Sequence, residues 1–199
     1  MATYEKDEGD IRLRVDKITH DYEATYSHLL RRGVRMDLLF AYAPRNRKGV
    51  ITGPAIKVHG VRALAQVKVL GLKDRTKGCG DVEILVDADW WSDADRKEEE
   101  RLAVIDHELC HIIVTDDDDK AGRPKIWLRD HDWQFGWFTL IAARWGNASQ
   151  EVQQAAEILL KAGEHYYPGI MTRNDDDLQL QMRRAGRIAK LETEPPVAA

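Results

Sequence analysis

The sequence contains very little cysteine, since only Cys79 and Cys110 occur among its 199 residues. Two cysteines exclude a disulfide-stabilised scaffold, and their separation excludes a C-x-x-C zinc site. No apolar run approaches the roughly 18 to 20 residues that span a bilayer. The N-terminal stretch MATYEKDEGDIRLRV also lacks the apolar segment of a signal peptide. These absences predict a cytoplasmic protein without a membrane segment.

A large net charge is missing as well. The formal net charge of −4 gives no general attraction to nucleic acid or to an anionic membrane. The chain does have 43% hydrophobic residues, which is enough for a core, and 32% charged residues, which fits a folded soluble protein. The length predicts one domain of ordinary size, with a tail.

The spacing of apolar residues predicts alternating helices and strands. Steps of three or four residues predict a helix over 10–32 that is closed by Gly33, and a long helix within 90–114 with Ser92 as its N-cap. Two more helices are expected over 131–146 and 149–163, separated at Gly146, and a basic helix over 178–192. The expected strands are 34–43, 63–72, 81–88 and 125–130. The order predicts one α+β domain over 1–168, followed by a polar C-terminal segment over 169–199.

The stretch AVIDHELCHIIV, residues 103–114, carries the strongest chemical signal. On a helix, His107 and His111 lie one turn apart on the same face and can bind one metal ion together. Glu108, rotated by about 100° from His107, can reach a metal-bound water as a general base. An apolar stripe of Leu102, Ile105, Leu109 and Ile112 would anchor this helix against a sheet. The competing interpretation is two ordinary histidines on an amphipathic helix.

A catalytic zinc needs a third protein ligand and an open position for water. His131 is the favoured candidate, because it follows His111 closely and precedes the aromatic cluster Trp133, Phe135, Trp137 and Phe138. The alternatives are Asp132, Glu151, Glu157 and His165. Cys110 points away from His111 on a helix, so we interpret it as a packed thiol. We interpret Asp116 to Asp119 as a solvated loop, one of whose carboxylates could orient a zinc-bound imidazole.

The segments DHELCHI and RDHDWQF together resemble the phage metallopeptidase family and, more distantly, the SprT-like zinc metalloproteases. The resemblance extends from about residue 10 to 146. It implies a zincin-like fold, with a small mixed sheet packed against an active-site helix, and a Zn²⁺ ion bound by His107, His111 and His131 with Glu108 as the base. Asp132 departs from the SprT-like pattern, which has glycine there, and the chain lacks the cysteine-rich zinc ribbon that some SprT-like proteins append.

Two classes of function remain open at this point. One is a zinc-dependent endopeptidase acting on a protein or peptide. The other is a non-enzymatic, zinc-stabilised, phage-encoded module that binds a host protein or DNA. Binding to nucleic acid is suggested only by one basic helix face, which consists of Arg183, Arg184, Arg187 and Lys190. The strand over 81–88 could pair with an extended peptide or be an ordinary core strand. Candidate oxyanion stabilisers are Arg129, His165, Tyr166 and Tyr167.

Overall fold

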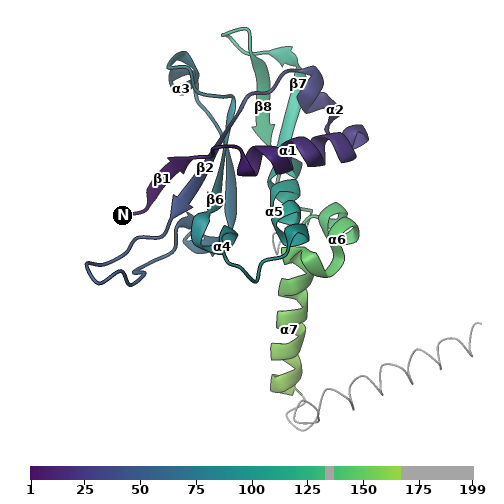
Figure 1. Cartoon of the computed structure of the whole chain (residues 1–199). Helices are drawn as coiled ribbons and strands as arrows, with labels where there is room; N and C mark the ends of the chain where they lie inside the picture. The colour runs from purple at the N-terminus through teal and green to yellow at the C-terminus, as the bar shows by residue number, and fades with distance from the viewer. Residues whose placement is uncertain (133–136, 167–199) are drawn as a thin grey trace, which may run out of the picture. The chain divides into compact units, whose positions relative to one another are not determined.

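A computed structural model describes residues 1–132 and 137–166 of the chain (Figure 1). Met1–Gln153 form one compact unit, and the described residues from Gln154 to Tyr166 belong to a second. The expected boundary at residue 168 and the expected basic helix over 178–192 lie outside the described residues. No helix among the described residues is long and apolar enough to cross a membrane.

The described residues form a mixed α/β structure with one larger sheet, two small sheets and several helices. The helices are α1 (Asp10–Asp21), α2 (Glu23–Arg31), α3 (Leu72–Thr76), α4 (Ala88–Trp91), α5 (Glu98–Cys110), α6 (Thr139–Trp145) and α7 (Gln150–Tyr166), with a 3-10 turn at Gly146–Ala148. The strands are β1 (Thr3–Lys6), β2 (Met36–Tyr42), β3 (Ile56–Val58), β4 (Val61–Ala63), β5 (Ala65–Val69), β6 (Val82–Asp87), β7 (Ile112–Asp118) and β8 (Pro124–Leu128).

The larger sheet has the strand order β1-β2-β6-β5, in which β2 and β6 are parallel and the other two pairs are antiparallel. β3 pairs with β4, and β7 with β8, in two separate hairpins. The interpretation of 81–88 as an edge strand for a peptide is therefore wrong, because β6 is bonded to a neighbour on each side. The free edge beside it belongs to β5.

The main core lies between one face of the sheet and the helices. Alternate residues of β6, Val82, Ile84 and Val86, are fully buried there, as their period of two requires. The predicted stripe of α5 packs into the same core, with Ile105 and Leu109 fully buried. At about 1.5–3 kcal/mol for each large aliphatic side chain, this burial anchors α5 firmly. A smaller cluster on the opposite face joins β2 to the β3–β4 hairpin through Ala41 and Ile56.

Three of the expected helices differ from the structure. The helix expected over 131–146 begins only at Thr139, because Phe138 before it has an extended backbone. The helix expected over 10–32 is divided at Tyr22, whose φ of −119° and ψ of 42° are not helical. The long helix begins at Glu98 instead of Ser92. Asp87 caps a separate short helix, α4, by accepting hydrogen bonds from the backbone N–H groups of Asp89 and Trp90, and Ser92 follows that helix as its C-cap. The acidic first turn of α5 then suits the positive end of its dipole.

The chain changes from helix to strand directly after the second histidine. His111 is the C-cap of α5 and keeps helical dihedrals, while Ile112 is the first residue of β7. The β-branched run Ile112, Ile113 and Val114 favours this change. β7 includes residues 116–118, so the prediction of a solvated loop there is wrong for these three carboxylates.

Candidate metal centre

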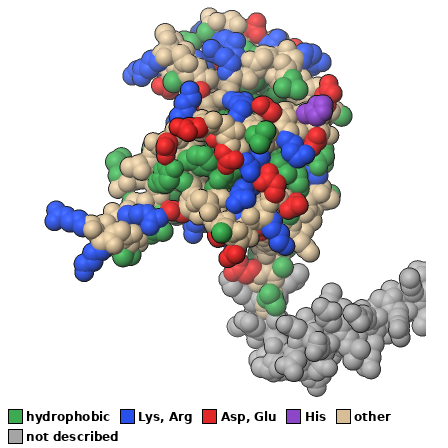
Figure 2. Space-filling model, in the orientation of Figure 1, with side chains coloured by type: hydrophobic (Ala, Val, Ile, Leu, Met, Phe, Trp, Pro, Cys, Tyr) green, Lys and Arg blue, Asp and Glu red, His purple; other side chains and the backbone are tan. Residues whose placement is uncertain are grey.

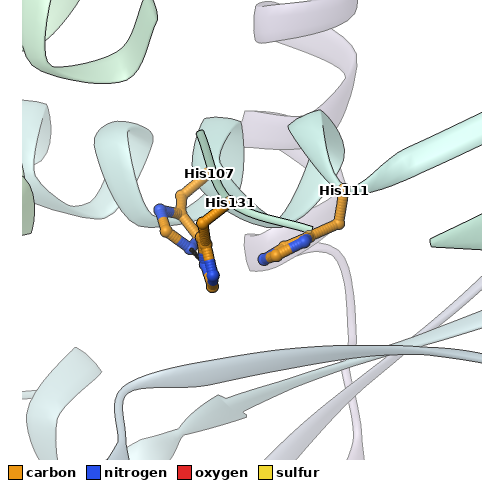
Figure 3. Close-up of side chains that lie close together, drawn as sticks. All are labelled: His107, His111 and His131. Carbon is orange, nitrogen blue, oxygen red and sulfur yellow. Dashed lines mark hydrogen bonds between the residues drawn. The ribbon is translucent and has the colours of Figure 1, made fainter. Parts of the chain in front are cut away.

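The structure brings three of the predicted ligands together from two parts of the chain. His107 and His111 come from the last turn of α5, and His131 comes from the segment after β8, where the sequence predicted the start of a helix. One nitrogen from each ring lies within 4.8 Å of the other two. Figure 3 shows the three rings grouped beside the helix, with the side chains directed toward one another. Among the described residues, this histidine site is the group of three that could hold a metal ion.

The position of His131 follows from a reciprocal backbone contact. The N–H of Arg129 donates to the carbonyl of His111 at 2.8 Å. In return the carbonyl of Arg129 accepts from Nδ1 of His111 at 2.9 Å. These two bonds fix the end of β8 against the end of α5, and His131 lies two residues further on. The segment that carries His131 is thus held to α5 by backbone contacts, which a pattern of side chains in the sequence does not predict.

The outer nitrogens of two imidazoles already have hydrogen-bond partners. Nδ1 of His107 is 2.7 Å from Oε1 of Glu151, which is almost fully buried at the start of α7. Nδ1 of His111 has the carbonyl of Arg129. A metal-binding histidine usually donates its second N–H to a carboxylate or a carbonyl, which fixes the ring and leaves Nε2 for the metal. Both rings have this arrangement.

The donor set fits a zinc-sized ion. Nε2 of His107 and Nε2 of His131 are 3.1 Å apart. Two nitrogens bound to one tetrahedral zinc at its usual bond lengths are separated by roughly 3.3 Å. Three imidazoles also form a neutral set of intermediate softness, which suits zinc, copper, iron or nickel better than magnesium or calcium. The residues therefore fit a transition-metal ion with three protein ligands.

A buried phenyl ring packs against the whole site. The centroid of Phe138 lies 4.9, 4.7 and 4.9 Å from the ring centroids of His107, His111 and His131. Phe138 is 1% exposed, and the guanidinium of Arg129 lies 4.7 Å from its centroid. The sequence placed Phe138 in an aromatic cluster, and this ring does pack into the core beside His131. Trp133 and Phe135 of that cluster lie outside the described residues.

Burial affects the protonation of the three rings differently. It lowers the pKa of His111 to about 4, and it lowers the pKa of His131 below its ordinary value. Burial also acts to lower the pKa of His107, but the hydrogen bond to Glu151 and the nearby carboxylate of Glu108 outweigh it, so this pKa is raised. His111 and His131 are therefore neutral at neutral pH, which is the form that binds a metal.

Glu108 is buried between α5 and the edge strand β5. Its side chain is 6% exposed, and burial raises its pKa, while His107 and the backbone N–H of Val67 favour the charged form. A buried carboxylate with a raised pKa is a common property of general acids and bases. Glu108 therefore lies on a different side of α5 from His107 and His111, as the rotation of about 100° per residue along a helix requires.

The other predicted candidates lie outside the group of three. Asp132 accepts hydrogen bonds from Arg129 and from the backbone N–H of Thr139, so it secures the start of α6. Glu151 contacts His107 through Nδ1, the ring nitrogen turned away from His131. Glu157 is exposed on α7, and the side chain of His165 lies outside the described residues. The side chain of Tyr166 and the whole of Tyr167 also lie outside them.

A second buried carboxylate, Asp106, holds the back of the site together. It is fully buried and accepts hydrogen bonds from Tyr26, from the guanidinium of Arg144 and from the indole of Trp145. The hydroxyl of Tyr26 is also 3.2 Å from Sγ of Cys110, so Cys110 is packed away from the imidazoles as expected. Sequence reasoning missed this network, because its members come from α2, α5 and α6.

The helix with H-E-x-x-H, the converging third histidine and the buried glutamate are residues of the kind that a metal-dependent hydrolase uses. The chain belongs to the family described as "Putative phage metallopeptidase", whose model matches residues 2–159. No curated protein and no solved structure matches the chain. The resemblance noted in the sequence is therefore confirmed for the phage family, and membership implies a metal ion and a protein or peptide substrate.

Proposed function

We propose that this protein is a zinc-dependent endopeptidase with a zincin-like arrangement, in which His107, His111 and His131 bind zinc and Glu108 is the general base. The observation that supports it best is the convergence of three imidazoles, two of them held from behind, on the helix that also carries a buried glutamate. A purely structural zinc site has no need of such a glutamate, because its fourth position is closed by another ligand.

The chain's own residues would divide the work of peptide hydrolysis. Zinc bound by the histidines would supply Lewis acidity and make water a stronger acid. Glu108 would accept the proton from the attacking water on its carboxylate and transfer it to the leaving amine. Glu151 and the carbonyl of Arg129 would hold the rings of His107 and His111 in place. The backbone of an extended substrate would pair with β5, which is the edge strand next to Glu108.

The test is Glu108→Gln, which keeps the size of the side chain and removes the carboxylate. Zinc content, measured by native mass spectrometry, should stay at that of the wild type, because Glu108 is not among the three ligands. Cleavage of unfolded casein should fall by at least about 100-fold, the low end for a general base. The control is Glu99→Gln, an exposed glutamate on the same helix, which should cleave normally.

Equal cleavage by the wild type and Glu108→Gln would contradict the assignment of the base. A well-folded wild type that binds no zinc after supplementation would contradict the metal site. A zinc-loaded wild type that cleaves no member of a broad peptide library would favour a zinc-stabilised binding module in place of the enzyme.

A further inference from the structure

One segment of the chain has a charge pattern opposite to the whole. From Leu38 to Lys73 there is no aspartate or glutamate, although acidic residues outnumber basic ones over the full sequence. The same segment contains seven basic residues: Arg45, Arg47, Lys48, Lys57, Arg62, Lys68 and Lys73. It forms the connection from β2 through the β3–β4 hairpin to the edge strand β5. A local excess of one charge attracts molecules of the opposite charge.

The first part of this segment is a tight turn that exposes two cations. Arg45 and Ile51 form an isolated bridge, and the side chain of Asn46 accepts hydrogen bonds from the backbone N–H groups of Lys48 and Val50. Arg47 and Lys48 are exposed at its tip, without an ion pair in the described structure. The loop between β2 and β3 projects from the sheet in Figure 1, and Figure 2 shows Lys and Arg side chains on an arm that stands out from the surface.

The second part places two like charges directly opposite each other. In the β3–β4 hairpin Lys57 pairs in register with Arg62, and both are exposed. Like charges at such positions destabilise a strand pair. Arg62 reaches Asp87 at 3.0 Å, whereas Lys57 forms no ion pair within the described residues. The fold thus compensates the charge of Arg62 but not that of Lys57, which leaves the lysine available to a partner outside the fold.

A cavity of about 230 Å³ lies between these two hairpins. Its wall includes Ile51 from the first and Arg62 from the second, together with the small residues Ala43, Gly53 and Ala55. Two carboxylates also border it. Each of them already has an arginine partner, Arg62 for Asp87 and Arg45 for Asp89. The cavity is therefore largely apolar and has room for an aliphatic side chain.

Exposed aliphatic side chains lie on both hairpins beside the cations. Val50, Ile51 and Val61 are 58%, 48% and 70% exposed. No Phe, Trp or Tyr occurs from residue 43 to 63, and the exposed Tyr42 just before it is hydrogen-bonded to Glu5. The hairpins themselves therefore offer no row of aromatic rings on which the bases of a single-stranded nucleic acid could stack. Contacts to phosphates alone would use the cations but leave the aliphatic residues and the cavity without a partner. Cations next to aliphatic residues fit a polypeptide better.

We propose that the basic hairpins, residues 45–51 and the β3–β4 hairpin, form a docking surface for an acidic segment of a protein substrate that inserts an aliphatic side chain into the cavity between them. This inference rests on the proposed peptidase function. β4 leads directly into β5, whose Val67 contacts Glu108. The hairpins are thus joined by the chain to the edge strand that lies beside Glu108, and a substrate held on them has a direct continuation along β5.

The experiment measures binding separately from cleavage, using the full-length, zinc-loaded Glu108→Gln protein. The probe is a short fluorescein-labelled peptide of glutamates around one central leucine, followed by fluorescence anisotropy. The triple variant Arg47→Glu, Lys48→Glu and Lys57→Glu should bind it at least about tenfold more weakly, and binding should weaken with added salt. The control is Lys6→Glu, Lys77→Glu and Lys120→Glu, an equal change in net charge at exposed lysines outside the basic segment, which should bind the probe almost normally.

A second variant tests the cavity. A Cβ at Gly53 would meet only Cγ of Pro44, at the ordinary contact distance of 3.6 Å, and Gly53 lines the cavity, so we expect Gly53→Leu to fold and to fill part of it. It should remove the preference for the leucine peptide over one with a central glycine. Equal weakening by both triple variants, or no binding of the acidic peptide, would overturn the proposal. Tighter binding of a single-stranded or duplex oligonucleotide on the same residues would overturn it in favour of nucleic acid. These outcomes do not depend on whether the wild type cleaves anything.

Discussion

The surroundings of the histidine site and the basic hairpins are both rich in charged residues, but they differ in whether those charges are paired within the fold. Around the histidines the buried carboxylates have partners within the fold: Asp106 has Arg144, Glu151 has His107, and Glu108 has the backbone N–H of Val67. On the hairpins Lys48 and Lys57 are exposed and form no ion pair among the described residues. A buried charge must be paired because desolvation is costly, whereas an exposed one is held in water. The first region is thus organised by its own contacts, and the second is open to a partner.

In the histidine site, the largest expected effect is the loss of zinc affinity when one of the three proposed ligands is removed. His131→Ala leaves two imidazoles on one helix end, so zinc affinity should fall by well over about 100-fold, more than the loss of an outer hydrogen bond causes. Competition with a chromogenic chelator measures it. The control is His59→Ala, an exposed histidine in the turn of the β3–β4 hairpin, which should bind zinc normally. If His131→Ala retains zinc while Glu151→Ala loses it, the third ligand is a carboxylate and the assignment is wrong.

Removing the charge of Asp106 should have the next largest effect. Asp106→Asn leaves the guanidinium of Arg144 buried without its carboxylate, and breaking such a pair costs about 3 to 5 kcal/mol of the free energy of unfolding. Urea unfolding of the zinc-free protein measures the loss. Asp118→Asn, which breaks the exposed pair with Arg32, should cost no more than about 1 kcal/mol. Equal losses from the two variants would show that the network behind the site is no stronger than a surface pair.

The carboxylate of Glu151 should have an intermediate effect, and it acts through His107. Glu151→Gln keeps a side chain of the same shape but removes the charge that holds the N–H of the ring, so zinc affinity should fall by about 10- to 100-fold. The zinc stoichiometry should remain one per chain at saturating metal, because the three imidazoles are still present. A complete loss of zinc would instead make Glu151 a ligand.

Much of the histidine site could be predicted from the sequence because its signals are local. The spacing of His107 and His111 requires only a helix, and the apolar stripe of α5 supplied independent support for one. His131 followed from its nearness along the chain and from the resemblance to a family. The partners of the site could not be predicted in the same way. Glu151 is 44 residues from His107, and their contact depends on how α7 begins beside α5, which no periodicity encodes.

The differences between the predicted and the observed fold also have physical causes. Ser92 resembles an N-cap, yet Asp87 caps a separate short helix before it, and Ser92 ends that helix as its C-cap. The N-cap of α5 is Lys97, a residue type that gives no N-cap signal in the sequence. The strand over 81–88 was found at the correct place, but its apolar alternation does not reveal which strands lie beside it. Sheet order depends on contacts distant in sequence, so the alternation could not decide between a peptide-pairing strand and the ordinary core strand that β6 is.

The smallest expected effect is a change in the free energy of unfolding when a charge on the basic hairpins is reversed. The sign of this change decides whether the fold itself needs the charge. Lys57→Glu replaces a repulsion with Arg62 by an attraction across the β3–β4 pair, so the free energy of unfolding should rise by about 0.2 to 1 kcal/mol. Lys17→Glu, which replaces an attraction to Asp21 by a repulsion, should lower it slightly. Thermal unfolding at low salt measures both, and added salt should reduce both differences. A fold that becomes more stable when Lys57 is lost does not need that lysine for itself, whereas a loss of stability would give Lys57 a structural role and remove the argument that an outside partner accounts for it.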